Sequence, residues 1–178
     1  MTAARLTSKN GFIIPPAGGI IQIQYAQKTD TGSITLPVGT PIAFTDLSVN
    51  ITPTSTSSII KLEAMLCGEF GDADNAWNSV STFLRDDVNV ITQVGSRTCG
   101  VGHFASPYHA DNNANTPEWS YYTYFDTPNT TSQVTYKAAI EAGWINNDTF
   151  HINRTKDDTN ASNYERLTSF ITVTEIAG

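Results

Sequence analysis

Apolar and polar residues alternate with a period of two along much of this chain. Residues 20–28 place apolar side chains at every second position, beginning with Ile21, Ile23 and Tyr25. Residues 60–66 repeat the alternation in a longer and clearer form. This period predicts β-strands with one buried face. Similar patterns predict strands over residues 41–45, 47–51, 77–85, 88–94, 101–105, 119–125, 133–142, 149–153 and 167–176.

Turn-forming residues separate these segments. Gly, Pro, Asp, Ser and Thr gather at residues 30–32, 37–39 and 53–58. Roughly ten short strands with turns between them are typical of an all-β sandwich or barrel. No segment keeps a period of 3.6, so we expect neither crossover helices nor a parallel sheet. Loops are expected over residues 68–75, 107–117 and 154–165.

The first nineteen residues differ from the rest and predict an extended N-terminal arm. Phe12, Ile13 and Ile14 are followed by Pro15 and Pro16, and then by two glycines. Proline removes backbone donors, so this stretch should form neither a central strand nor a helix. Its three large apolar side chains favour docking on a surface. Two interpretations stay open: the arm binds a partner, or it folds back along its own domain, residues 20–178.

Composition narrows the class of protein. The chain has 178 residues, enough for one domain, or one domain plus an arm. It carries 17 acidic and 10 basic residues, for a net charge of −7, which argues against a nucleic-acid partner. The 25 threonines, 14 asparagines and 14 serines suit strands and turns. No apolar run approaches 18 residues and no secretory signal is present, so we expect a soluble protein without membrane insertion or export.

Candidate chemistry is sparse in this sequence. Cys67 and Cys99 are too few for a disulfide scaffold, and we expect two buried free thiols. His103 and His109 match no zinc spacing, and residues 72–75 begin like a calcium loop without completing one. No Gly-X-Ser-X-Gly elbow and no glycine-rich phosphate loop occur. We therefore expect a protein without a cofactor, a metal or enzymatic activity.

Recognition, if the chain has that role, falls to its loops and its aromatic side chains. Loops on a rigid β scaffold vary without disturbing the core. An aromatic strand over residues 119–125 is expected to contribute core or subunit-interface residues, although exposed rings can also stack on sugars. The candidates for outward recognition loops are Asp72, Asp74, Asn75, Tyr108, His109 and Asn112, and those for the core or interface are Trp119, Tyr121 and Phe125.

Several segments, taken together, resemble a module of tailed-bacteriophage virion proteins, often from phages of aquatic bacteria. The module occurs as the C-terminal head of tail fibres and as small stand-alone decoration or fibre proteins. The resemblance covers residues 20–178, nearly the whole chain apart from the arm. The segments that carry it are residues 20–28, 45–58, 83–86, 124–132, 150–155 and 171–178.

The resemblance implies an antiparallel jelly-roll β-sandwich, similar to tumour-necrosis-factor-like heads, that assembles as a homotrimer. It supplies no catalytic residues. One departure matters, because a typical fibre has a long shaft before this head and here about twenty residues precede it.

The expected function is that of a non-enzymatic virion structural protein, assembled in the bacterial cytoplasm and attached by its arm to other virion proteins. Trimeric knobs or short fibres would contact a host surface glycan. One alternative is a capsid decoration protein that cements neighbouring shell subunits against internal DNA pressure. A further alternative is a host-polysaccharide depolymerase, which would need acidic residues clustered in a groove, although the chain lacks the repeats of a β-helix.

Overall fold

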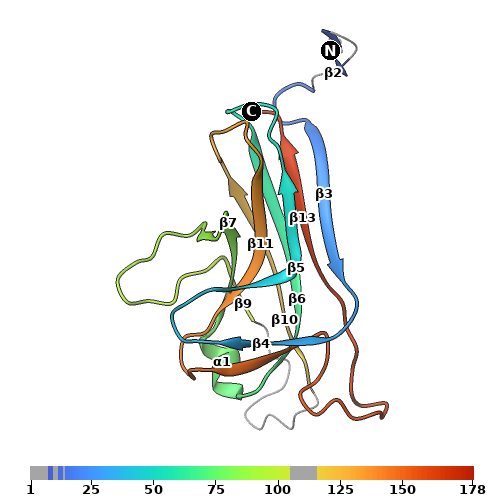
Figure 1. The fold of residues 1–178 in the computed structure, drawn as a ribbon, viewed down its shortest axis with the longest axis vertical. Helices are drawn as coiled ribbons and strands as arrows, with labels where there is room; N and C mark the ends of the chain where they lie inside the picture. Colours follow the sequence, from blue (N-terminus) through green and yellow to red (C-terminus); the bar gives the residue numbers. More distant parts are fainter. Residues whose placement is uncertain (1–7, 10–11, 14, 105–115) are drawn as a thin grey trace, which may run out of the picture.

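Two antiparallel β-sheets make up most of the protein in a computed structural model that describes residues 8–9, 12–13, 15–104 and 116–178 (Figure 1). The prediction of an all-β chain with sandwich-like sheets is confirmed. The six-stranded sheet contains, in order, β3 (Ile20–Lys28), β13 (Ser169–Ile176), β6 (Ile59–Phe70), β12 (Asp148–Ile152) and β4 (Gly32–Leu36), with β10 (Glu118–Asp126) also paired to β6. The five-stranded sheet contains β5 (Ile42–Ile51), β11 (Val134–Glu141), β7 (Val80–Arg85) and β8 (Val88–Asn89), with β9 (Gly102–His103) also paired to β7.

Strand β6 organises the six-stranded sheet, because it pairs along both edges. One edge pairs with β10, and the other pairs first with β13 and then with β12. Gly68 lies where β6 meets β12, and a Cβ at this position would lie 2.2 Å from the carbonyl oxygen of His151. The inward row of β6 is fully buried and consists of Ile60, Leu62, Ala64 and Leu66.

The core lies between the inward rows of the two sheets. Aromatic side chains fill it in edge-to-face contacts, such as Phe44 with Phe150 and Phe70 with Phe104. A polar link also joins the sheets, since Arg85 on β7 and the hydroxyl of Tyr136 on β11 both donate to Asp126 at the end of β10. Burial of these rows supplies most of the favourable free energy of folding.

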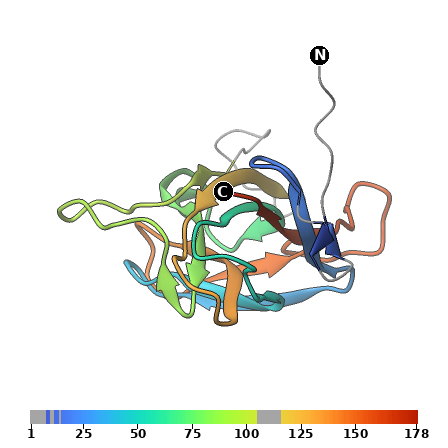
Figure 2. The ribbon, with the colours of Figure 1, turned by 90° about the horizontal axis from the view of Figure 1, so that it is seen from above.

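Several predicted elements have different bounds in the structure. The two strands expected over 41–45 and 47–51 form one continuous strand, β5, and only the first two residues of 88–94 form a strand, β8. The rest of that segment belongs to a connection over residues 90–101 that extends away from the sandwich (Figures 1 and 2). Its tip is a self-bonded turn in which Gln93 donates to the carbonyls of Gly95 and Arg97.

The largest difference between the predicted and the observed elements lies at residues 68–75, where a loop is expected. Strand β6 continues to Phe70, and a helix, α1 (Ala73–Asn78), follows, so Trp77 belongs to a helix rather than a strand. Asp72 caps the helix by accepting a hydrogen bond from the backbone N–H of Asp74. Six residues make less than two turns, too few to produce a detectable helical period. This short helix does not meet the size and hydropathy needed to span a membrane, and the described residues contain no other helix.

The chain enters and leaves the sandwich at the same end, which we call the proximal end. The N–H of Gly18 donates to the carbonyl of Ala177, and the N–H of Ala177 donates to the carbonyl of Gly19. Before this point, β1 (Ser8–Lys9) and β2 (Phe12–Ile13) form a separate two-stranded ladder. Helix α1 and strand β4 lie at the opposite, distal end (Figure 1). Ile14 lies outside the described residues.

A buried carboxylate fixes the proximal end. Glu175 on β13 is fully buried and accepts hydrogen bonds from Gln22, from the hydroxyl of Ser58, and from both the N–H and the hydroxyl of Thr54, at 2.6–2.7 Å. Burial alone would raise its pKa. The hydrogen bonds outweigh burial and hold the pKa of Glu175 below its ordinary value.

Replacing Glu175 with Gln should lower the free energy of unfolding by about 1–3 kcal/mol at pH 7, because an amide cannot accept from all of these donors. The loss should shrink as the pH falls. The pKa of Glu175 is lower in the folded than in the unfolded protein, so its carboxylate stabilises the fold at any pH above the unfolded-state pKa. This contribution disappears as the pH falls through the folded-state pKa. Urea unfolding in steps from pH 7 down to pH 2.5, at one protein concentration, measures both effects.

The control for this experiment is the exposed Glu165, whose change to Gln should cost less than about 0.5 kcal/mol. Equal losses for the two variants would contradict the structural role of Glu175.

Candidate functional site

The outward face of the six-stranded sheet carries an unusual set of exposed side chains. Residues of β10 that pair with inward-facing residues of β6 also face the core. Tyr122 pairs with the buried Ala64 and therefore points into the core. The alternate residues of β10 therefore face outward, where Tyr121 is 52% and Phe125 is 56% exposed. We call six exposed residues on this side the aromatic face: Ile20, Ile23 and Tyr25 on β3, and Trp119, Tyr121 and Phe125 on β10.

This placement removes one of the two roles expected for the outward aromatic residues of β10. Trp119, Tyr121 and Phe125 share one strand face, as predicted, but within a single chain they are not core residues. The aromatic residue of β10 that enters the core is Tyr122, which packs on Phe83 with ring centroids 4.6 Å apart. Whether the three outward residues form a subunit interface stays a prediction.

Strand β3 also turns its apolar row outward. Its alternation suggested that Ile23 and Tyr25 would be buried, yet they are 53% and 75% exposed. The opposite row contains Gln22, which donates to Glu175 on the neighbouring strand β13, and Lys28, which donates to Asp46 on β5 of the other sheet. The polar row faces inward because β3 lies at the sheet edge, where those acidic partners satisfy it.

Cross-strand rows connect the two edges of this face. Ile23, Thr174, Lys61 and Phe125 form one row in register across β3, β13, β6 and β10. The next row contains Glu63, which lies 2.9 Å from the Nζ atom of Lys61. Tyr121 donates its hydroxyl hydrogen to the same carboxylate at 3.0 Å. Lys61 first, and Tyr121 in addition, hold the pKa of Glu63 below its ordinary value, so the charges at the centre of the face are already paired.

The residues predicted to form outward recognition loops differ in their exposure. Asp72 and Asp74 are exposed, but Asn75 is fully buried, which corrects its assignment to an outward loop. Its amide donates to the carbonyl of Ile145 and to Asp148, and its oxygen accepts from the N–H of Ile145. Asn75 is therefore a structural tie between α1 and the segment before β12. Tyr108, His109 and Asn112 lie outside the described residues.

The two cysteines and His103 are described by their burial and their backbone contacts. Both cysteines are free, and burial raises the pKa of the Cys67 thiol to about 11. Cys99 is only partly buried, so the expectation of two buried thiols is wrong for this residue. Both ring nitrogens of His103 contact backbone carbonyls, those of Phe104 and Trp77. Within the described part of the chain, no three His, Cys, Asp or Glu side chains are grouped to hold a metal ion.

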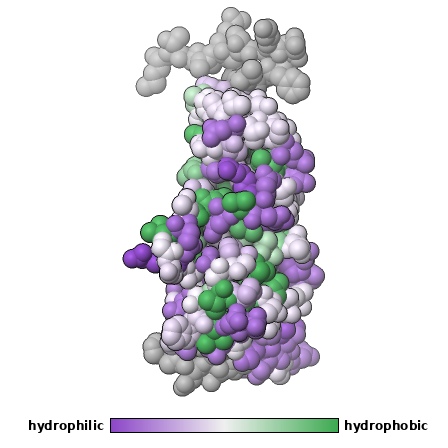
Figure 3. Space-filling view, turned by 60° about the vertical axis from the view of Figure 1, so that its left-hand side comes forward, coloured by the Kyte–Doolittle hydropathy of each residue, from purple (hydrophilic) through white to green (hydrophobic). Residues whose placement is uncertain are grey.

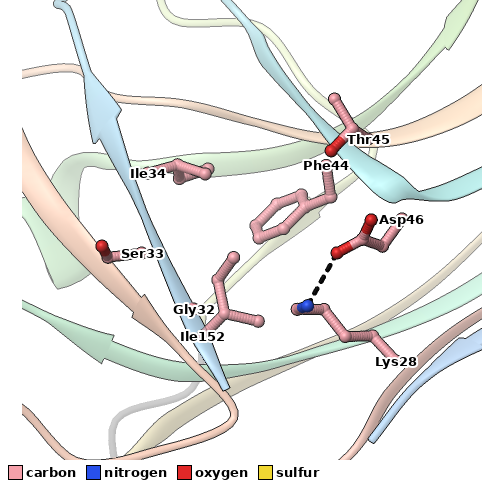
Figure 4. A pocket seen from close by; sticks show the side chains of 8 residues that line it. All are labelled: Lys28, Gly32, Ser33, Ile34, Phe44, Thr45, Asp46 and Ile152. Carbon is pink, nitrogen blue, oxygen red and sulfur yellow. Dashed lines mark hydrogen bonds and ion pairs between the residues drawn. The ribbon is translucent and has the colours of Figure 1, made fainter. Parts of the chain in front are cut away.

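A small pocket opens between β3, β4, β5 and β12 (Figure 4). Lys28 lies at its side, 94% buried, and its ammonium group contacts Asp30 at 2.9 Å and Asp46 at 2.7 Å. The hydrogen bond to Asp30, followed by that to Asp46, raises the pKa of Lys28. The cavity holds about 120 Å³, well below the roughly 300 Å³ at which ligand pockets begin. We interpret the ion pair between Lys28 and Asp46 as a link that holds β3 against β5, and no pattern in the sequence predicts it.

Two buried carboxyl groups were also missed by sequence reasoning. Glu118 is almost fully buried and accepts a hydrogen bond from the N–H of Phe70, and burial raises its pKa to about 8. Glu69 is fully buried, burial raises its pKa, and its Oε2 atom accepts from the N–H of Lys156 at 2.6 Å. Because both carboxyl groups are closed off from solvent, they do not line a substrate groove of the kind that a depolymerase requires.

Comparison with known proteins adds no assignment: no family model matches this chain, and no curated protein matches it.

Replacing Glu118 with Gln should stabilise the protein at pH 8 by roughly 1–4 kcal/mol and leave its stability nearly unchanged at pH 4.5. A carboxyl group with a raised folded pKa favours folding at low pH, and this contribution is lost as the pH rises from 4.5 toward 8. The amide keeps an acceptor for Phe70 and has no charge to lose. Urea unfolding across this pH range measures the difference, and a variant less stable than the parent at pH 8 would contradict the assignment.

Proposed function

We propose that this chain is a non-enzymatic structural protein of a tailed-bacteriophage virion, a jelly roll that assembles as a homotrimer through its aromatic face. The observation that carries the proposal is the gathering of six exposed large apolar residues on one face of one sheet. Large exposed apolar side chains that gather on one face of a sheet, here in two groups, indicate an interaction site. Trp, Tyr and Phe are also the residue types enriched in protein interfaces.

The strand order supports a jelly roll. Four strands of one sheet, β3, β13, β6 and β10, are neighbours, and so are β5, β11, β7 and β8 of the other. Successive long strands alternate between the sheets, from β5 to β6 and then to β7. Two interleaved four-stranded sheets are the arrangement of a double Greek key.

The placement of the apolar residues supports a ring of copies. One group lies on β3 and the other on β10, with β13 and β6 between them, so about 14 Å separates the two strands. The β3 group of one copy can contact the β10 group of the next. Such head-to-tail contacts close into a ring when the rotation between copies permits it. The count of three comes from the resemblance to fibre heads.

The two ends of the molecule support attachment at one of them. The N-terminal segment joins the sandwich beside the C-terminus at the proximal end, whereas α1 lies at the distal end (Figure 1). An arm that grips the particle would therefore leave the distal end facing away from it. A tail knob and a shell decoration protein share this geometry; we propose the knob, with the decoration protein as the alternative.

Light scattering of the purified protein should give a mass three times 19.3 kDa. Changing Phe125 to Glu should dissociate the trimer, because it buries a charge in the proposed interface, and should leave the circular dichroism of the chain unchanged. The matched control is Val88→Glu, since Val88 is 70% exposed and lies on β8, outside the aromatic face. An F125E variant as trimeric as the parent would contradict the proposed interface.

Removing residues 1–14 should keep the trimer and abolish attachment to particles. The hydrogen bonds between Gly18, Gly19 and Ala177 survive this deletion, so the sandwich should keep its unfolding midpoint. Immunogold labelling of purified virions, assembled with the full or the shortened chain, measures attachment. Full-length protein absent from virions would refute the virion assignment, and equal labelling by the shortened chain would refute the role of the arm.

A further inference from the structure

A second group of exposed apolar side chains lies at the distal end, on segments that do not belong to the aromatic face. Trp144 is 64%, Trp77 46% and Val38 41% exposed. They lie on three segments that contact one another: Val38 forms a β-bridge with Ala142, and Gly143 lies against the carbonyl of Asn78 at the end of α1. We call Val38, Trp77 and Trp144 the tryptophan patch.

The segment that carries Trp144 is held from both sides. Asn75 bonds both the N–H and the carbonyl of Ile145, and Asn146 accepts a hydrogen bond from the N–H of Val38. A Cβ at Gly143 would lie 2.2 Å from the carbonyl oxygen of Asn78, so the chain passes directly against the end of the helix. The indole of Trp144 is thus presented to solvent on a fixed backbone, and binding would cost little ordering of the protein.

The size of the patch decides between classes of occupant. A stable protein interface buries about 800 Å² on each partner and involves roughly 20 residues. Two partly exposed indoles and one valine provide only about 300 Å², given that a whole aromatic side chain buries about 150–250 Å². On the side shown in Figure 3, apolar areas are small and lie among hydrophilic ones. Such an area matches one or two sugar rings rather than a second protein.

The chemistry around the patch agrees with a sugar. Exposed neighbours along the chain are the amides of Asn78, Asn146 and Asn147 and the carboxylate of Asp74. Amides and carboxylates bond hydroxyl groups, while an indole offers a flat apolar surface to the C–H face of a pyranose ring. The neighbouring amides are neutral and the one charge is negative, which favours a neutral sugar over an anionic one.

We propose that the tryptophan patch is a binding site for neutral carbohydrate, with Trp144 as the stacking surface. The inference rests on the proposed function only in that the distal end faces away from the particle. Aromatic stacking and a few hydrogen bonds give a weak site, with a dissociation constant on the order of 1 mM, which three copies on one particle-bound trimer would strengthen.

The test is a calorimetric titration of the full-length protein with maltotriose, cellotriose, chitotriose and a β-1,4-galactotriose. At least one of the four should bind the parent protein. Changing Trp144 to Ala should weaken that binding at least tenfold, and Trp144→Phe should restore part of it. The control is Val94→Ala, because Val94 is 58% exposed and lies on the 90–101 connection, outside both surfaces. Its affinity should stay within twofold of the parent.

Three results would overturn the inference: no binding of any of the four sugars, equal weakening by V94A, or a change in oligomeric mass in W144A, which would assign the patch to a protein contact. Light scattering on the same samples keeps the two proposals separate. A trimer that binds no sugar would refute the sugar site alone, and a monomer that binds sugar through Trp144 would refute the trimer alone.

Discussion

Burial of one row of side chains on β6 determines which residues of this molecule face outward. This row is fully buried and consists of Ile60, Leu62, Ala64 and Leu66. Because β6 pairs along both edges, its register decides which residues of β13 and β10 face the core and which face outward. A shift of one residue in β10 would bury Tyr121 and expose Tyr122. The exposure of the aromatic face therefore follows from the same hydrophobic burial that stabilises the core.

The surface has three regions with different chemistry. The proximal end is closed by polar bonds to Glu175 and by the paired backbone of Gly18 and Ala177. One broad side carries aromatic rings around an internally neutralised ion pair. The distal end carries indoles on a backbone fixed by Asn75. We interpret the proximal end as the place of attachment, the broad side as the contact between copies, and the distal end as the contact with a ligand.

The sequence predicted long strands well and local exceptions poorly. Alternation located β3, β6, β10, β11 and β13, because in each of them one row is apolar over several residues. It did not reveal which row faces inward at a sheet edge, as on β3, where Gln22 and Lys28 find acidic partners distant in sequence. Helix α1 is too short to show a period, and the environments of Asn75 and Glu118 depend on tertiary contacts.

Oxidative footprinting of the native protein measures whether sister copies cover the aromatic face in solution. In a single chain, Tyr25 and Phe125 would be open to hydroxyl radicals, at 75% and 56% exposure. If sister copies cover this face, Phe125 and Tyr121 are protected at micromolar concentration and become reactive on dilution, while Trp144 is labelled throughout. Labelling of the aromatic face at the rate of a freely exposed side chain, at every concentration, would contradict the proposed contact between copies.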